Sequence, residues 1–167
     1  MQDFSDLRPT LQQLARALTQ RGWMLATAES CTGGLIAAAC TDLPGSSTWF
    51  DRGFVTYSNA AKTEMLGVPE SLIAEHGAVS EEVVRAMAEY SVLRSNASVS
   101  VAVSGVAGPG GGSADKPVGT VWIAWHLNGA TYARCLRFSG DRNSVRHQTK
   151  SQALSCLLSF IDSTTNQ

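Results

Sequence analysis

The hydrophobic positions along the chain change between helical and strand spacing. Near the N-terminus, apolar residues recur at helical spacing and predict an amphipathic helix, with Pro9 near its start and Gly22 just past its end. A short apolar run over residues 23–28 predicts a buried strand, and the run over residues 33–40 predicts a buried helix. This order of strand and helix is typical of α/β folds.

The middle of the chain continues the alternation. Residues 49–56 predict a strand, and Asn59 after it predicts the N-cap of a helix over residues 60–66. A short helix is expected over residues 69–76, and a longer helix is expected to begin at a cap formed by Ser80.

The last third of the chain predicts a strand, a hairpin and a helix. Valines alternate strictly within residues 97–103, which is typical of a strand. The strands expected over residues 119–127 and 131–138 are separated by Asn-Gly, a strong signal for a two-residue hairpin. A final helix is expected from residue 142 to about residue 161. Because of the hairpin, the sheet is predicted to be mixed rather than purely parallel.

The candidate active centre is the polar turn between the first strand and the second helix. The segment Thr27-Ala28-Glu29-Ser30-Cys31-Thr32-Gly33-Gly34-Leu35 brings hydroxyls and a thiol to a helix start. The first N–H groups of a helix lack intrahelical partners and can bind a phosphate or a developing oxyanion. The same residues are also typical of a simple helix cap and a glycine turn, so both interpretations are open at this point.

Three further features are candidates for binding or chemistry. The glycine-rich loop over residues 104–113 follows a strand, where open α/β sheets bind ligands, although it carries neither an ATP nor a dinucleotide fingerprint. Lys62 is expected in the first turn of a helix, where the helix dipole disfavours a cation. Arg142 stands at a loop–helix junction and has the geometry to fork onto a phosphate or carboxylate. The alternatives are a mobile surface loop, a solvated lysine and a solvated basic face.

Length and charge restrict the classes of protein. The chain has 167 residues, which predicts one domain over residues 1–167. Its formal net charge of −1 gives no long-range attraction to nucleic acid or to an anionic membrane. No apolar run reaches the roughly 18 residues of a membrane span, and the acidic N-terminus lacks the apolar core of a signal peptide. We therefore expect a cytoplasmic protein with neither nucleic acid nor membrane as a partner.

The cysteines and histidines do not indicate a metal site. None of the four cysteines forms a Cys-x-x-Cys pair, and the three histidines are far apart in sequence. Isolated cysteines in a cytosolic chain are usually small buried hydrophobic residues. Cys31 is the one to examine, because a thiol at a helix start can have a lowered pKa.

The motifs of this sequence resemble one family closely. The chain is similar to the CinA C-terminal-domain family over nearly its whole length, and the motifs occur in the expected order. The resemblance is carried by Thr27-Ala28-Glu29-Ser30-Cys31-Thr32-Gly33-Gly34, Gly53-Phe54-Val55-Thr56-Tyr57-Ser58-Asn59 with Lys62, Gly77-Ala78-Val79-Ser80, Ser104-Gly105-Val106-Ala107-Gly108-Pro109 and Lys116-Pro117-Val118-Gly119-Thr120-Val121. The length implies the stand-alone form, without the molybdopterin-binding-like domain of longer relatives.

The resemblance implies both a fold and an activity. The implied fold is an α/β three-layer α/β/α sandwich with a mixed, mostly parallel sheet. Characterised members hydrolyse the carboxamide of nicotinamide mononucleotide to nicotinate mononucleotide and ammonia, without a metal or another cofactor. The family's active-site serine, tyrosine and lysine fall on Ser30, Tyr57 and Lys62.

These three residues fit the chemistry of amide hydrolysis, which needs a nucleophile, a base, an acid and an oxyanion donor. No histidine lies near the motifs, so a Ser-His-Asp triad is unsupported. We expect Ser30 to be the nucleophile and Lys62 the base, if burial lowers the lysine pKa. Tyr57 is expected to be a proton relay or oxyanion donor. The oxyanion hole is expected from backbone N–H groups near Thr32-Gly33-Gly34.

Other residues are expected to bind substrate or to support the site. The candidates for holding the ribose phosphate are Ser104, Gly105, Gly108 and Arg142. Glu29 is expected to orient the turn rather than to react. Two residues depart from many relatives: Tyr90 replaces an expected glycine, which bears on packing or assembly, and Gly110 replaces a frequent acidic residue, which bears on loop mobility or affinity.

Three alternatives to a serine amidohydrolase remain. Cys31 is a rival nucleophile. A nucleotide-binding module that has lost catalysis would keep the same motifs. A protein-interaction domain has little support beyond three tryptophans, which are expected in the core or at a subunit interface: Trp49, Trp122 and Trp125. A symmetric homo-oligomer is also expected, with a dimer as the guess and a tetramer left open.

Overall fold

A five-stranded sheet runs through the middle of the computed structural model, which describes residues 6–164. The strand order is β2-β1-β3-β4-β5. β1 pairs in parallel with β2 and β3, whereas β4 is antiparallel to β3 and β5. Four strands therefore share one direction, which confirms the mixed, mostly parallel sheet. The strands are β1 (Leu25–Glu29), β2 (Phe50–Val55), β3 (Val99–Gly105), β4 (Thr120–Leu127) and β5 (Ala130–Arg137).

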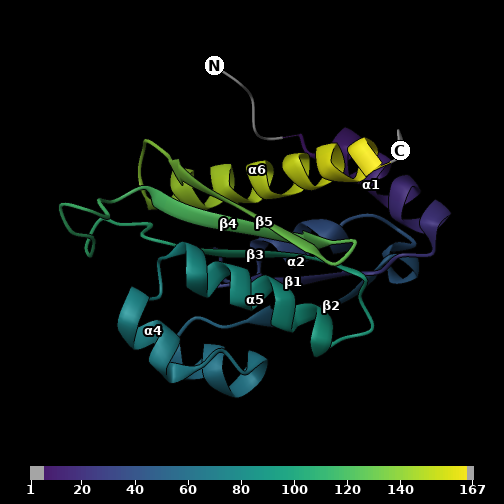
Figure 1. The fold of residues 1–167 in the computed structure, drawn as a ribbon. Coiled ribbons are helices and arrows are strands. Elements are labelled where there is room, and N and C mark those ends of the chain that lie inside the picture. The colour runs from purple at the N-terminus through teal and green to yellow at the C-terminus, as the bar shows by residue number, and fades with distance from the viewer. Residues whose placement is uncertain (1–5, 165–167) are drawn as a thin grey trace.

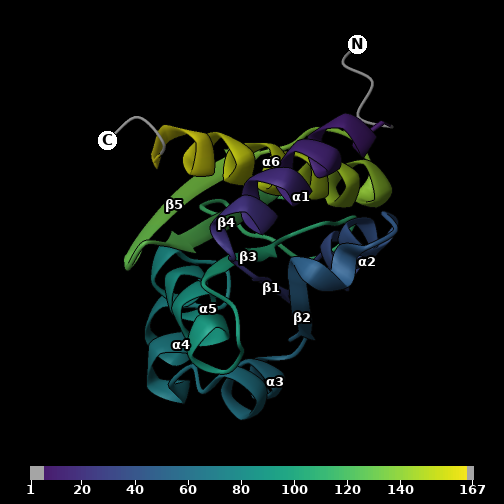
Figure 2. The same ribbon diagram turned by 90° about the vertical axis from the view of Figure 1, so that its right-hand side faces the viewer.

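Helices cover both faces of this sheet, which confirms the three-layer arrangement (Figures 1 and 2). One face carries α1, α2 and α6, and the other carries the helices between β2 and β3. The helices are α1 (Arg8–Arg21), α2 (Leu35–Thr41), α3 (Asn59–Ala61), α4 (Glu70–His76), α5 (Glu81–Leu93) and α6 (Arg142–Ser163), with a 3₁₀ turn η1 (Ser46–Thr48) and a π-helical turn η2 (Lys62–Leu66).

The two faces of the sheet have different cores. Large apolar residues such as Val101, Ile123 and Trp125 pack towards α1, α2 and α6. Small residues such as Ala102 and Ala124 face α5 on the other side. Small side chains let a helix approach a sheet closely, and Ser100 Oγ reaches the carbonyl of Ala88 on α5 at 2.6 Å.

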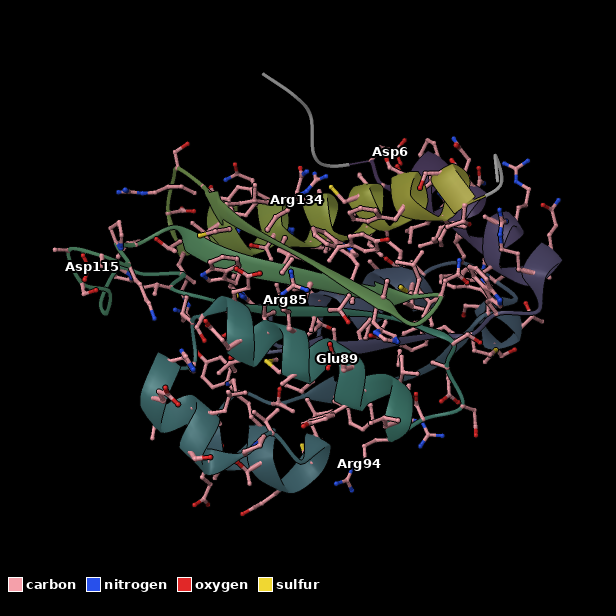
Figure 3. The ribbon with its side chains drawn as sticks, in the orientation of Figure 1. Asp6, Arg85, Glu89, Arg94, Asp115 and Arg134 are labelled. Atoms are coloured by element: carbon pink, nitrogen blue, oxygen red, sulfur yellow. The ribbon has the colours of Figure 1, made fainter. Side chains whose placement is uncertain are left out.

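Polar contacts fasten α5 to the β4–β5 hairpin. The side chains of Arg85 and Glu89 come from α5, next to the hairpin (Figure 3). Arg85 Nη1 donates to the carbonyl of Thr131 at 2.6 Å, and the hydroxyl of Thr131 donates to Glu89 at 2.8 Å. The hairpin turn has positive φ at Asn128 and Gly129, as its Asn-Gly sequence predicts.

Two predicted helix starts are wrong. The helix expected over residues 33–40 begins instead at Leu35, because Gly33 and Gly34 have φ values of 58° and 102° that no α-helix contains. The expected N-cap Asn59 is the first helical residue, and Ser58 caps α3 by accepting a hydrogen bond from the N–H of Ala61 at 3.0 Å. Polar residues of similar capping propensity stand side by side here, so the sequence did not distinguish them.

Candidate active site

A cleft of about 250 Å³ opens where the parallel strands end. Ser30 directly follows β1, Tyr57 lies two residues beyond β2, and Ser104 is the next-to-last residue of β3. The carboxyl ends of neighbouring parallel strands meet at one edge of the sheet, which explains why these distant motifs converge. The side chains with candidate chemistry that line the cleft are Ser30, Cys31, Tyr57, Lys62, Ser104 and Arg142.

Lys62 lies at the bottom of this cleft and is only 1% exposed. Its Nζ contacts three oxygens: the carbonyl of Thr56 at 2.9 Å, Ser30 Oγ at 3.1 Å and the carbonyl of Tyr57 at 3.5 Å. None of the ion pairs within residues 6–164 includes Lys62. Burial without a carboxylate partner therefore lowers the pKa of the Lys62 ammonium.

The three contacts of Lys62 Nζ suit the three donors of an ammonium and also the two donors and one lone pair of a neutral amine. An uncharged lysine has two N–H donors and one lone pair. The carbonyls of Thr56 and Tyr57 accept only, so they take up the two N–H groups. In the structure, Lys62 Nζ donates to Ser30 Oγ at 3.1 Å, and Ser30 Oγ donates to the carbonyl of Tyr57 at 3.5 Å. In the neutral amine, the lone pair is left to accept the hydroxyl proton of Ser30. This geometry suits a serine that is deprotonated by a neutral lysine.

Tyr57 contributes its backbone and its hydroxyl to different partners. Its carbonyl contacts Lys62, while its side chain is 60% exposed and reaches Arg142. Arg142 Nη2 donates to the Tyr57 hydroxyl at 2.9 Å, and Nη1 donates to the carbonyl of Gly108 at 2.8 Å. Because the hydroxyl accepts from Arg142, its own proton is available to a ligand in the cleft.

The start of α2 is occupied by a side chain of the chain itself. The N–H groups of Ile36 and Ala37 donate to the buried carboxylate of Glu29 at 2.8 and 2.9 Å. The expectation that this helix start binds a phosphate or an oxyanion is therefore wrong for these two groups. The expectation that Glu29 orients the turn is confirmed, since the hydroxyl of Thr32 also donates to it at 2.6 Å.

Three residues predicted to bind substrate lie in the turn that follows Ser30, and their contact with substrate stays a prediction. The side chain of Thr32 is buried against Glu29, and the N–H of Gly33 donates to the carbonyl of Ser30 at 3.0 Å. Gly34 lies beside Val55. The backbone N–H of Thr32 has no acceptor among the described residues, and the backbone N–H of Cys31 contacts only its own thiol there.

The remaining predicted residues lie around the cleft. Ser104 lines it and donates its hydroxyl to the carbonyl of Ala78 at 2.7 Å. Gly105 has no room for a side chain, since a Cβ would lie 2.6 Å from Val121 and 2.8 Å from the carbonyl of Thr120. Gly108 contacts Arg142 through its carbonyl. The glycine-rich loop then projects from the body of the protein as far as Asp115 (Figure 3).

The comparisons with known proteins identify the family of this chain. A model of the CinA C-terminal domain matches residues 8–161. The chain belongs to the CinA C-terminal domain family. It is 51% identical over 156 residues to the nicotinamide-nucleotide amidohydrolase PncC of Escherichia coli, covering 92% of this chain and 93% of the relative. It is 57% identical over 137 residues to the PncC of Enterobacter agglomerans, covering 81% and 84%.

The fold of this CinA C-terminal domain also matches solved structures. The competence damage-inducible protein A of Klebsiella pneumoniae superposes with a TM-score of 0.91 at 39% identity. The match covers 95% of this chain and 98% of that chain. The predicted family membership is therefore confirmed by sequence and by structure.

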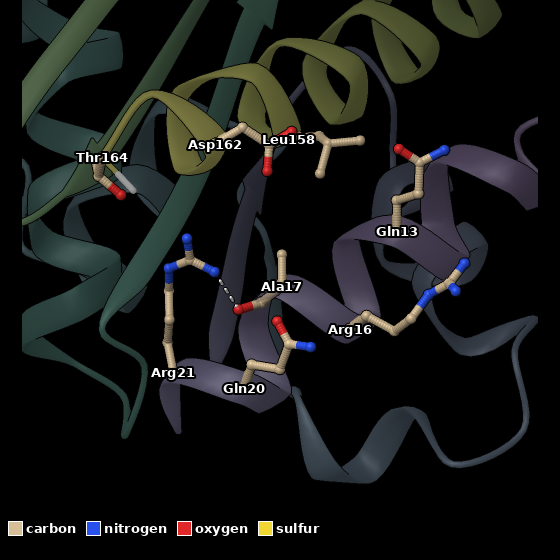
Figure 4. Close-up of a pocket in the computed structure, with 8 residues that line it drawn as sticks. All are labelled: Gln13, Arg16, Ala17, Gln20, Arg21, Leu158, Asp162 and Thr164. Carbon is tan, nitrogen blue, oxygen red and sulfur yellow. Dashed lines mark hydrogen bonds between the residues drawn. The ribbon is translucent and has the colours of Figure 1, made fainter. Parts of the chain in front are cut away.

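The CinA C-terminal domain has other hollows besides the cleft. A larger hollow of about 580 Å³ lies between α1 and the end of α6, where Arg21 donates to the carbonyl of Ala17 (Figure 4). It contains none of the residues predicted for catalysis. Within residues 6–164, no three His, Cys, Asp or Glu side chains gather where a metal ion could bind, and no helix has the length and hydropathy of a membrane span.

Sequence reasoning gave Arg146 no role at the site. Its guanidinium extends from α6 to the carbonyls of Cys31 and Thr32, at 3.1 and 3.0 Å. The only signal in the sequence was a group of basic residues at the start of the last helix. That signal does not say which of them turns inward.

Proposed function

We propose that this chain hydrolyses the carboxamide of nicotinamide mononucleotide to nicotinate mononucleotide and ammonia, with Ser30 as the nucleophile and without a metal. The observation that carries the proposal is the 3.1 Å contact between Ser30 Oγ and a buried Lys62 that has no carboxylate partner among the described residues. The names of the PncC relatives support the substrate class.

In the first half of the reaction, Ser30 Oγ attacks the carboxamide carbon and neutral Lys62 takes up its proton. The carbonyl oxygen becomes an oxyanion, which the backbone N–H groups of Cys31 and Thr32 stabilise. The C–N bond then breaks as the nitrogen receives the proton that Lys62 took from Ser30, relayed through the Tyr57 hydroxyl, and ammonia leaves with Lys62 neutral again. The products of this half-reaction are ammonia and a nicotinoyl ester of Ser30.

In the second half, water attacks the ester carbon and Lys62 takes up the proton of the water. Collapse of the intermediate breaks the bond to Ser30 Oγ, and the proton on Lys62 returns to the serine. The acid product gives its remaining proton to ammonia or to solvent, and nicotinate mononucleotide leaves as the carboxylate. The hydroxyl of Tyr57, held by Arg142, is the relay that passes the proton from Lys62 to the leaving nitrogen in the first half and is itself reprotonated by Lys62.

We propose that the ribose phosphate lies on the Arg142 side of the cleft. A hollow of about 580 Å³ adjoins the cleft there, and Ala107 and Arg142 line both. Arg142 is the cation best placed to bind a phosphate, because guanidinium groups bind its oxygens in pairs. Ser104 and Gly105 line the cleft, and the carbonyl of Gly108 holds Arg142.

The function is tested by incubating purified protein with nicotinamide mononucleotide in the presence of EDTA and measuring ammonia and nicotinate mononucleotide together. We expect equal amounts of the two products. Binding of the nucleotide without ammonia release would instead favour the alternative, a nucleotide-binding module that has lost catalysis.

The cysteine-hydrolase alternative is disfavoured by the state of the thiol. Cys31 is 5% exposed, and burial raises the pKa of its thiol to about 11. A thiol with this pKa is protonated near neutral pH, and the protonated form is a poor nucleophile.

We therefore expect Cys31→Ser to retain activity within about fivefold of the natural protein, because the thiolate has no role in the mechanism. Steady-state rates of ammonia release measure this. Loss of activity comparable to that of a Ser30 variant, in a folded protein, would make Cys31 the nucleophile instead.

Arg142→Met is expected to raise KM for nicotinamide mononucleotide by about 10- to 100-fold, because it removes a charge-assisted hydrogen bond to the phosphate. Tyr57→Phe is the matched variant, since it removes the hydroxyl that Arg142 contacts and leaves the guanidinium in place. For Tyr57→Phe, kcat should fall while KM stays nearly constant. An unchanged KM in Arg142→Met would contradict the proposal that the ribose phosphate binds on the Arg142 side of the cleft.

A further inference from the structure

Arg146 connects the last helix to the turn that follows Ser30. Its Nε donates to the carbonyl of Cys31 at 3.1 Å, and its Nη2 donates to the carbonyl of Thr32 at 3.0 Å. These two contacts hold consecutive peptide groups of the turn from α6, more than a hundred residues away in sequence. Two donors in a rigid fork fix an orientation that a single hydrogen bond does not.

The direction of a carbonyl also fixes the direction of the next N–H. A trans peptide is planar, so its C=O and its N–H point in opposite directions. With the carbonyl of Cys31 on Arg146, the N–H of Thr32 points away from the guanidinium. This N–H has no acceptor among the described residues, whereas the N–H of Gly33 is taken by the carbonyl of Ser30.

We propose that Arg146 is a positioning residue for amide hydrolysis, which orients the N–H of Thr32 as an oxyanion donor without touching the substrate. The inference rests on the proposed function, in which Ser30 forms the oxyanion next to this turn. It gives the turn two supports of opposite charge. The carboxylate of Glu29 holds N–H groups of α2 and the hydroxyl of Thr32, and the guanidinium of Arg146 holds the carbonyls.

A different role for Arg146 is direct binding of the phosphate, because it lines the same hollow as Arg142. The two roles differ in the kinetic constant that they change. A phosphate ligand contributes equally to substrate and transition state, so its loss raises KM. An oxyanion donor acts only in the transition state, so its misplacement lowers kcat and leaves KM nearly constant.

The experiment compares Arg146→Met, Arg146→Lys and Lys150→Met in the natural protein. Lys150 is the matched control, since it lies four residues further along α6 and contacts none of the cleft. For Arg146→Met we expect kcat to fall by about 100-fold with KM within about threefold, the loss typical of one oxyanion donor. Arg146→Lys keeps donors for the carbonyls and should recover part of kcat. Lys150→Met should be unchanged.

A second measurement is independent of the natural substrate. A fluorophosphonate reacts with an activated serine hydroxyl: the oxygen bonds to phosphorus, fluoride leaves, and the serine proton passes to the base. We expect mass spectrometry to find the label on Ser30, and the labelling rate to fall in Arg146→Met but not in Lys150→Met. Thermal unfolding of each variant checks that it is folded, and Arg146→Lys replaces Arg146→Met if the latter does not fold.

The results separate the two proposals. The positioning role is overturned if the natural protein releases ammonia and Arg146→Met has an unchanged kcat or only a raised KM. The proposed function is unaffected by that result. If the natural protein is inactive on nicotinamide mononucleotide but its Ser30 labelling still depends on Arg146, the proposed substrate is wrong. The positioning role of Arg146 is then retained. Absence of both activity and labelling overturns both.

Discussion

Ser30→Ala is expected to lower kcat for ammonia release from nicotinamide mononucleotide by at least about 10³-fold, because it removes the only atom that forms the acyl intermediate. The substitution should not disturb the fold. The Ser30 side chain is 8% exposed, and its loss leaves Lys62 Nζ with both carbonyl acceptors. Substrate affinity should change little, since the phosphate contacts lie on the Arg142 side of the cleft.

Two measurements on this variant decide between mechanisms. The first is the rate of ammonia release beside a binding titration of nicotinamide mononucleotide, and we expect the rate to be lost and the dissociation constant to stay within a few-fold. The second is acid quench of the natural protein during turnover, in which mass spectrometry should find the nicotinoyl ester on Ser30. Substantial turnover by Ser30→Ala would show that water attacks the amide directly.

The fold was largely predictable because its elements have strong local signals. Apolar runs in the sequence predict the buried strands, and Asn-Gly between two strands predicts the hairpin. The two errors at helix starts concern turns with several capping residues, where backbone dihedral angles decide the boundary. Positive φ at Gly33 and Gly34 delays α2 to Leu35.

The sequence predicted only in part which side chains come together in the cleft. The motifs around Ser30, Tyr57 and Lys62 follow strand ends, so their proximity follows from a parallel sheet. The sequence could not show that Glu29 occupies the start of α2, because this depends on a side chain that points to the opposite face from Ser30. The contact of Arg146 with the same turn depends on tertiary packing. The homodimer stays a prediction.

Lys62→Met is expected to abolish activity to a similar extent, by about 10³- to 10⁴-fold, since general-base catalysis is lost while the stem of the side chain keeps its packing. The natural protein should show kcat rising with pH as Lys62 loses its proton. Because burial lowers the pKa of this ammonium, the rise is expected below the range in which an exposed lysine titrates. Lys62→Met should lose this limb of the pH profile together with the activity.

The same lowered pKa has a consequence for stability. In the pH window between the folded and the unfolded pKa of Lys62, the unfolded chain binds the proton and the folded chain does not, so the free energy of unfolding rises with pH. Below the folded pKa, the cost of burying the charged ammonium is fully present. Lys62→Met carries no such charge and should flatten the dependence of stability on pH across this window.

Urea unfolding of the natural protein and Lys62→Met over neutral to alkaline pH measures this difference, and Lys116→Met is the control. The Nζ of Lys116 also donates to a carbonyl, that of His76 at 3.0 Å, but this lysine is not buried. Its substitution should therefore leave the pH dependence of unfolding as in the natural protein. Near-normal kcat in Lys62→Met would exclude this lysine as the base. A pH dependence of unfolding equal to that of the natural protein would mean that the Lys62 ammonium is not destabilised by burial.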